Sequence, residues 1–311
     1  MRQGPVVRIN PWELHICDPE FFKTIYPWTR HDKSSQHLRF FDAPSSIVAT
    51  PDRDLHHQRR AAAEPSFNKA SVRTFVPHIQ AAVDTVIARL DKEYSGREAV
   101  ATLSDVFACY GGHVVAEFCF SWDGEFLSSP KFKAPLLTAF DEFMLYTHYI
   151  FHFGFLLPLF NFIPDKLLPA TAQTVHQFQE AIRCCIKDLQ SETRKADVNT
   201  GHKPVMETLL NSKLPAQEKT LERLNHEGYI MFAAGQSTPR VLTTAMFHLL
   251  QQPATMQRLR DEILNVFPDQ TVPPSLPQLE KLPFLTAVIM EGGFLLLHNS
   301  TSSLSASGLV S

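Results

Sequence analysis

Residues 231–250 read MFAAGQSTPRVLTTAMFHLL and lie within the longest helical candidate of the chain, residues 220–251. Two residues in this stretch disturb a regular helix. Gly235 leaves one position without a side chain, and Pro239 has no N–H for the carbonyl of Gly235, against which its ring also clashes. Between them, the hydroxyl of Thr238 is able to bond back to the carbonyl four residues earlier. The stretch therefore predicts a long helix with a bend between this glycine and proline; from spacing alone, a plain packing kink remains open.

Start signals of helices recur on both sides of this stretch. A helix-capping residue followed by proline, or proline itself in the first turn, marks such a start. Helix starts are indicated at Asp18-Pro19, Thr50-Pro51, Ser71, Pro253 and Pro283, and further helices at 102–120 and 170–194. The helix after Pro51 should end near Glu64-Pro65, because the residue before proline disfavours the helical region. Only residues 5–16 read as paired strands. The pattern predicts a mainly α fold with a small β-sheet.

Composition narrows the class of protein. The 311 residues are 44% hydrophobic and 20% charged, which is enough to bury a sizeable core. A net charge of -3 with scattered Lys and Arg residues is not the footprint of a nucleic-acid-binding protein. Five cysteines, an odd number with Cys184 and Cys185 adjacent, indicate reduced thiols in a cytosol-facing compartment.

The N-terminal residues contain neither an apolar signal-peptide core nor an apolar run that could span a bilayer, so we expect no transmembrane anchor in the chain as given. Residues 144–163, MLYTHYIFHFGFLLPLFNFI, are densely apolar but contain Pro158. They are suited to peripheral contact with a membrane surface, although a buried helix reads the same way. His148 and His152 have the i, i+4 spacing of metal ligands, but a third ligand at a helical offset is missing, so we expect no metal site.

Five segments, in order, resemble the cytochrome P450 family of haem-thiolate monooxygenases, in its filamentous-fungal form. The stretch quoted first resembles the family's oxygen-binding helix. The other four resemble its first β-hairpin, its C helix, its E helix and the run into its K helix. They read GPVVRINPWELHI, RFFDAPSSIVATPDRDLHHQRRAAAEPSF, SDVFACYGGHVVAEFCF and PSLPQLEKLPFLTAVIMEG. Together the matches cover nearly all of residues 4–292, and the resemblance implies a partial cytochrome P450 fold over residues 1–292.

The resemblance also implies site residues. The family's Ala/Gly-Gly-x-acid-Thr motif matches Ala234, Gly235, Gln236, Ser237 and Thr238, so that the helix would widen beside the haem and Thr238 would guide protons. Ser237 stands where the family has an acid, which puts the usual proton route in question. Cofactor binding would involve Ala234 and Gly235 at the haem face. Arg60, with His56 one turn earlier, matches the family's pair at a haem propionate, and a planar guanidinium suits a carboxylate.

By resemblance, the chain is a haem-dependent enzyme that hydroxylates an apolar metabolite with O₂ in secondary metabolism, such as a terpenoid or polyketide. Electrons would come from NADPH-cytochrome P450 reductase, at the cytosolic side of the endoplasmic reticulum membrane. These partners, and the absence of nucleic acid, are expectations.

The pattern departs from the family near its end. Glu291 fits the family's Glu-x-x-Arg ion pair, but Phe294 stands where the arginine belongs. No cysteine loop of the haem-binding type is recognisable, and Cys109 lies in a segment that reads as a helix. The alternative prediction is therefore an inactive product that at most binds an apolar ligand or a membrane surface. Residues 293–311 contain no charged residue and are rich in serine, and we expect them to be disordered.

Overall fold

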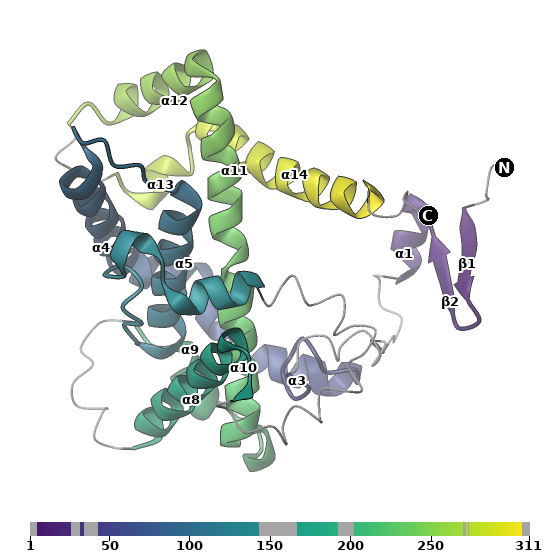
Figure 1. Cartoon of the computed structure of the whole chain (residues 1–311). Helices are drawn as coiled ribbons and strands as arrows, with labels where there is room; N and C mark the ends of the chain where they lie inside the picture. Colours follow the sequence, from purple (N-terminus) through teal and green to yellow (C-terminus); the bar gives the residue numbers. More distant parts are fainter. Residues whose placement is uncertain are drawn as a thin grey trace.

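A long, broken rod of two helices runs through the middle of the molecule (Figure 1). It consists of α10, Leu221–Gly235, and α11, Ser237–Gln251. The computed structural model describes residues 5–25, 32–33, 43–142, 167–191, 202–269, 272 and 274–306. The break falls at Gln236, where the sequence predicts the bend. The described chain is mostly helical with one small sheet, which confirms the predicted fold class.

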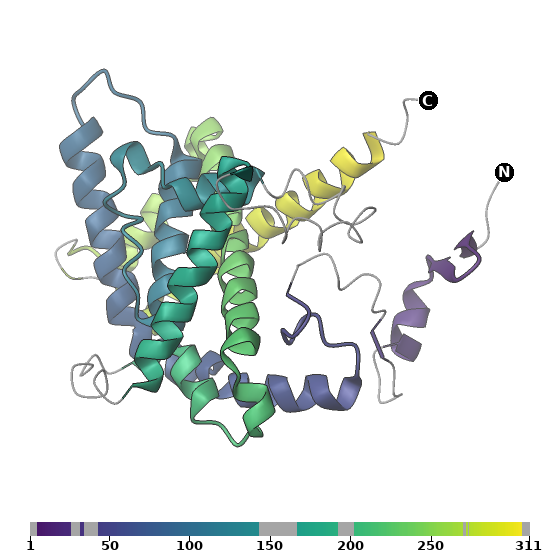
Figure 2. The same cartoon turned by 60° about the horizontal axis from the view of Figure 1, so that its bottom comes forward.

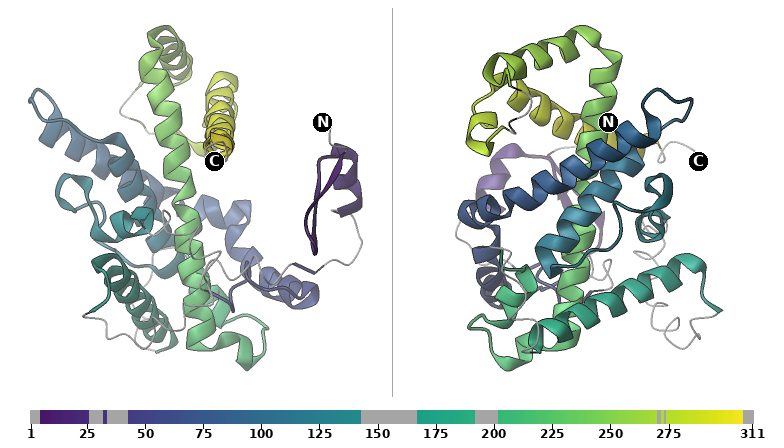
Figure 3. Two further views of the ribbon diagram at one scale, coloured as in Figure 1. Left: turned by 45° about the vertical axis from the view of Figure 1, so that its right-hand side comes forward. Right: turned by 90° about the vertical axis from the view of Figure 1, so that its left-hand side faces the viewer.

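The other elements surround this rod. The longer helices are α3 (Arg53–Ala63), α4 (Lys69–Tyr94), α5 (Leu103–Phe120), α8 (Ala170–Gln190), α12 (Pro253–Val266) and α14 (Pro283–Ala306). Shorter pieces are α1 (Phe22–Ile25), α9 (Val205–Leu210), α13 (Leu276–Leu279) and the 3-10 turns Pro19–Phe21, Glu64–Phe67, Pro130–Phe132 and Ala216–Lys219. In Figures 1 and 3, α4, α5 and α8 lie on one side of the rod, and α3 and α14 on the other.

Two helix caps differ from the sequence prediction by a few residues. Asp52, rather than Thr50, caps α3 by accepting a hydrogen bond from Leu55 N. Asn68, rather than Ser71, caps α4, and the backbone N–H of Ser71 is the donor to its side chain. The hydroxyl of Thr50 is engaged elsewhere, because it donates to the carbonyl of Ser46 and accepts from Arg59 Nη1.

Strands β1, Val6–Asn10, and β2, Glu13–Ile16, pair antiparallel and confirm the predicted hairpin. Figures 1 and 2 show them apart from the helical body. Trp12 at their turn is 87% exposed, so the described structure leaves the hairpin outside the core.

The core lies where α5, α8 and α10 meet. Phe178 of α8 packs on Phe232 of α10 with ring centroids 4.5 Å apart, and both rings contact Phe140. Burial of each such ring stabilises the fold by about 1.5 to 3 kcal/mol. Gly228 of α10 makes room for Phe120 of α5, since a Cβ there would lie 2.7 Å from that ring.

Helix α14 reaches into the last segment of the chain, residues 293–311, whose predicted disorder stays a prediction. Gly292 packs on α11, where a Cβ would lie 3.0 Å from that of Ala245, and the helix continues to Ala306. We expected disorder from residue 293 onward because the charges that make a helix amphipathic are missing. Residues 294–306 nevertheless contain no Gly or Pro, and backbone hydrogen bonds do not depend on amphipathicity. Residues 307–311 lie outside the described part.

No helix among the described residues is long and apolar enough to span a membrane. Residues 143–166 are outside the described part, so the structure does not test the membrane contact of 144–163 or the environment of His148 and His152.

The contact between α5 and α11 depends on Gly111, because a Cβ there would lie 2.3 Å from Cγ of Pro239. We expect Gly111→Ala to lower the free energy of unfolding by about 1 to 3 kcal/mol, since the rigid proline ring has little room to yield. Urea denaturation followed by circular dichroism measures this change. Gly293→Ala is the matched control, because its Cβ meets nothing within 4 Å. Equal stability of the two variants would contradict the prediction.

Candidate functional site

The bend between α10 and α11 presents two different faces. Ala234, Ser237 and Thr238 are exposed, whereas Pro239 is buried against α5. Val241 lies one helical turn after Thr238, and Ala245 lies two turns after it, so they share the face of Thr238 and Ala234. Val241 and Ala245 contact Gly292 of α14. The exposed stripe therefore lies on the side of the rod where α14 and α3 also lie (Figure 3).

Gly235 does not belong to this exposed stripe. A Cβ at this position would lie 2.3 Å from Cγ2 of Val115 in α5. In the described structure this glycine lets α5 approach the rod, and its place beside a cofactor stays a prediction. Ala234, the other small residue of the motif, is the one on the exposed face.

The hydroxyl that bonds back into the helix is also a different one from the predicted one. Ser237 Oγ donates to the carbonyl of Ala234 at 2.8 Å. Thr238 makes no side-chain hydrogen bond to any described residue, and its hydroxyl is exposed. A free hydroxyl on the open face is available to a bound molecule, whereas that of Ser237 is already engaged.

A group of basic side chains lies along α3, with His56 and His57 in its first turns, Arg60 in its last turn and Lys33 beside them. Burial, followed by the charges of Lys33, Arg60 and His57, lowers the pKa of His56. Burial and the charge of Arg60 likewise lower the pKa of Lys33. Both shifts report cations that lie close to one another. An anion at this place would relieve the repulsion.

Arg59, next to the predicted Arg60, is the residue that the sequence argument missed. An Arg-Arg pair on a helix is more often a solvated face, yet Arg59 is 7% exposed. Its Nε and Nη2 donate to the two carboxylate oxygens of Glu218 at 2.6 and 3.0 Å, and its Nη1 donates to Thr50 Oγ1 at 2.6 Å. These hydrogen bonds hold α3 to the turn before α10.

The pairing continues into α10. Arg223 lies 3.5 Å from Glu218 through Nε, and 3.0 Å from Glu227 through Nη2, in ion pairs without hydrogen-bond geometry. Glu227 in turn accepts from the backbone N–H of Ile47 at 2.9 Å. The hydrogen bonds from Arg59 lower the pKa of Glu218, whereas burial raises that of Glu227. The i, i+4 pair Arg223 and Glu227 in a helix of the core is the signal that could have revealed this network.

The described cysteines do not form part of the exposed stripe. Cys109 is fully buried in α5 and donates to the carbonyl of Phe132, and burial raises the pKa of its thiol to about 11. Burial also raises the pKa of Cys119 to about 12. Protonated thiols in a helix core are poor metal ligands, which agrees with the expectation that Cys109 is no axial ligand.

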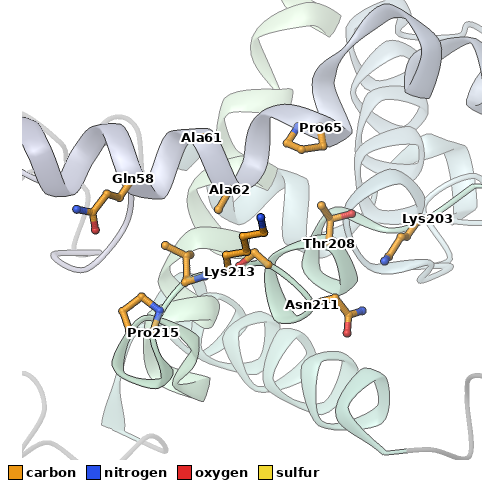
Figure 4. A pocket seen from close by; sticks show the side chains of 11 residues that line it. Gln58, Ala61, Ala62, Pro65, Lys203, Thr208, Asn211, Lys213 and Pro215 are labelled. Carbon is orange, nitrogen blue, oxygen red and sulfur yellow. Dashed lines mark hydrogen bonds between the residues drawn. The ribbon is translucent and has the colours of Figure 1, made fainter.

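Another face of α3 borders a cavity of about 610 Å³ against α9 and the turn after it (Figure 4). Ala61 and Ala62 of α3 and Pro65 of the 3-10 turn that follows it form one wall, and Lys203 and Lys213 lie on the opposite wall. Lys203 is paired with Glu207 at 3.5 Å. Arg60 and His56 do not line this cavity.

Comparison with known proteins identifies the class of protein that this arrangement belongs to. The profile of the cytochrome P450 family matches residues 13–292, and the chain belongs to that family. It is 32% identical over 310 residues to the cytochrome P450 monooxygenase sdnE of Sordaria araneosa, covering 94% of this chain and 59% of the relative. It is 33% identical over 294 residues to the tryptophan 6-hydroxylase fscE of Fusarium equiseti, covering 93% and 58%. It is 31% identical to the conidiogenone synthase PchP450 of Penicillium rubens, covering 93% and 58%. The chain thus spans a little under three fifths of the length of these relatives.

The charge network predicts a large loss of stability for Glu218→Gln. Arg59 and Arg223, both buried, would lose the carboxylate they share, and removal of one partner from a buried ion pair costs about 3 to 5 kcal/mol. Urea denaturation measures this loss. Glu222→Gln, an exposed position on the next turn, is the control and should change stability by less than about 0.5 kcal/mol. A small effect of both substitutions would show that the network does not hold α3 to α10.

Proposed function

We propose that the chain is part of a haem-dependent monooxygenase that hydroxylates an apolar small molecule with O₂. The observation that carries the proposal is the exposed stripe of Ala234 and Thr238 on the same side of the rod as α3, whose Arg60 has no ion pair with a described residue. Family membership makes haem-dependent oxidation the general chemistry.

The residues present suit haem on this side of the rod. Arg60 and His56 would hold its propionates, because a guanidinium donates to a carboxylate in a planar pair and a carboxylate would offset the positive charges that lower the pKa of His56. Ala234 would offer a small side chain to a flat ring. When bound, haem supplies the dioxygen and one-electron chemistry that amino-acid side chains lack.

Thr238 has the role of a proton donor and acceptor on the open face. Its hydroxyl makes no bond to a described residue, so it is able to hold a water molecule or a substrate hydroxyl without first breaking a protein contact. Ser237, which replaces the family's acid, keeps its hydroxyl on the carbonyl of Ala234 and helps to hold the bend open.

For the substrate, we propose an apolar secondary metabolite. The relatives include a conidiogenone synthase, a tryptophan 6-hydroxylase and an N-acetyltryptophan 6-hydroxylase, so both terpenoid-like and aromatic substrates fit the proposal. We further propose NADPH-cytochrome P450 reductase as the electron donor, at the cytosolic face of the endoplasmic reticulum membrane.

A second candidate is an inactive polypeptide that at most binds an apolar ligand or a membrane surface. The observation that favours it is the end of the family pattern in α14. Glu291 is exposed and has no ion pair with a described residue, and Phe294, at the position of the family's arginine, is 62% exposed.

Titration of the chain with haemin, followed by its absorption spectrum, tests the cofactor site. We expect Arg60→Ala to weaken haemin binding about tenfold or more, because a hydrogen bond to a charged group contributes about 1.5 to 3 kcal/mol. Arg53→Ala on the same helix is the control, since the side chain of Arg53 pairs with the exposed Asp54. If the unchanged chain, Arg60→Ala and Arg53→Ala all bound haemin with equal affinity, Arg60 would not be part of the haem site.

The spectrum of the reduced, carbon-monoxide-treated, haem-loaded chain separates the two candidate functions. A Soret band typical of thiolate-bound haem is the result expected for a monooxygenase, because a thiolate ligand drives cleavage of the O–O bond. Haem that binds without this band would favour the inactive candidate. Apo chain treated in the same way is the control.

A further inference from the structure

A cavity of about 310 Å³ lies beside the bend, on the side that faces α5 rather than α14. Its walls come from the first turns of α5, from residues 137–141 and from the first two turns of α11. Gln236 and Pro239 line it, whereas Ala234 and Thr238 do not. It is therefore distinct from the face proposed for haem, and the inference below does not depend on that proposal.

The apolar residues that line this cavity are packed against the core of the protein. Leu137 and Phe140 are 6% and 4% exposed, and the ring of Phe140 packs on Tyr229 and Phe232 with centroids 5.6 and 5.5 Å apart. Pro239 is held against Gly111. Side chains fixed in this way do not easily collapse into the space between them, so the cavity is a lasting feature of the packing.

One polar group in the wall lacks a partner. The Nε2 atom of Gln236 is buried and makes no hydrogen bond to a described residue. The hydroxyls of Thr243 and Thr244, which also line the cavity, already donate to the carbonyls of Pro239 and Arg240 at 2.9 and 3.0 Å. A buried donor without an acceptor costs about 1 to 3 kcal/mol, which a ligand with an acceptor would recover.

The two charged residues in the wall of the cavity, Arg240 and Asp141, form an ion pair with each other. Arg240 Nη2 lies 3.1 Å from Asp141 Oδ1, and these are the charged residues among the described residues that line the cavity. An ionic ligand would find no unpaired counter-charge here. The volume is at the lower end of the range for small-molecule sites, about 300 to 1,000 Å³.

We propose that this cavity binds a small neutral molecule, about one ring in size, through apolar contact with Ala108, Leu137, Phe140 and Pro239, and through one carbonyl group that accepts a hydrogen bond from Gln236 Nε2. Gln236 also joins the two helices of the rod, and its backbone N–H donates to the carbonyl of Ala233 at 3.2 Å. A molecule bound to the side chain of Gln236 therefore contacts the junction of α10 and α11. Its binding would change the geometry of this bend, and with it the opposite face, where Ala234 and Thr238 lie.

Saturation-transfer NMR on the full chain tests the proposal with two probes of the same shape. Cyclohexanone carries the carbonyl acceptor, and methylenecyclohexane lacks it. We expect cyclohexanone to bind and Gln236→Leu to weaken it about threefold to tenfold, the range for one neutral hydrogen bond. Binding of methylenecyclohexane should not weaken in this variant.

Ala108→Phe fills the cavity and should abolish binding of both probes. Ala61→Phe makes the same change in the cavity between α3 and α9 and should leave binding unchanged. If circular dichroism shows that Ala108→Phe is unfolded, Ser104→Phe at the exposed rim takes its place. Three outcomes would each overturn the proposal: no transfer to either probe, unchanged binding in a folded cavity-filled variant, or equal weakening of both probes by Gln236→Leu.

Discussion

The bidentate pairing of Arg59 with Glu218 is the contact on which the arrangement of the site depends. It joins α3, which carries Arg60, to the turn that starts α10, and Arg223 and Glu227 extend the pairing along that helix. Alternating charges let three buried ionic groups and the partly buried Glu218 neutralise one another, whereas a buried charge without a partner would be costly. Because Arg60 directly follows Arg59, the orientation of the cationic group relative to the rod follows from this pairing.

The residues at the bend of the rod have two different roles, close packing against α5 and an exposed face, and the sequence motif alone does not separate them. Gly235 and Pro239 serve packing, since they meet Val115 and Gly111 of α5 at distances that leave no room for larger groups. Ala234 and Thr238 remain on the other face. The same five residues therefore combine a close helix contact with an open stripe, and Gln236 between them points to a separate cavity. The motif works as a unit because successive helical residues project about 100° apart.

The sequence predicted more of the fold than of the candidate site. Helix starts at Pro253 and Pro283 and the hairpin were predictable, because proline and turn residues act locally. The helix through residues 293–306 was not predictable. The distribution of charged residues indicates which face of a helix is solvated, but not whether its backbone hydrogen bonds continue. At the site, Arg60 was chosen by its place in a motif, and Arg59 was overlooked, because its partner Glu218 lies 159 residues away.

The sequence by itself determined the family, the mainly helical class and the position of the bend, because each rests on residue types at short spacing. The tertiary structure decided on which side of the bend each residue lies, which of the two arginines is buried and which is exposed, and where a cavity remains. Those outcomes depend on neighbours far apart in the chain, Val115 beside Gly235 and Glu218 beside Arg59, whose approach only the packed helices bring about.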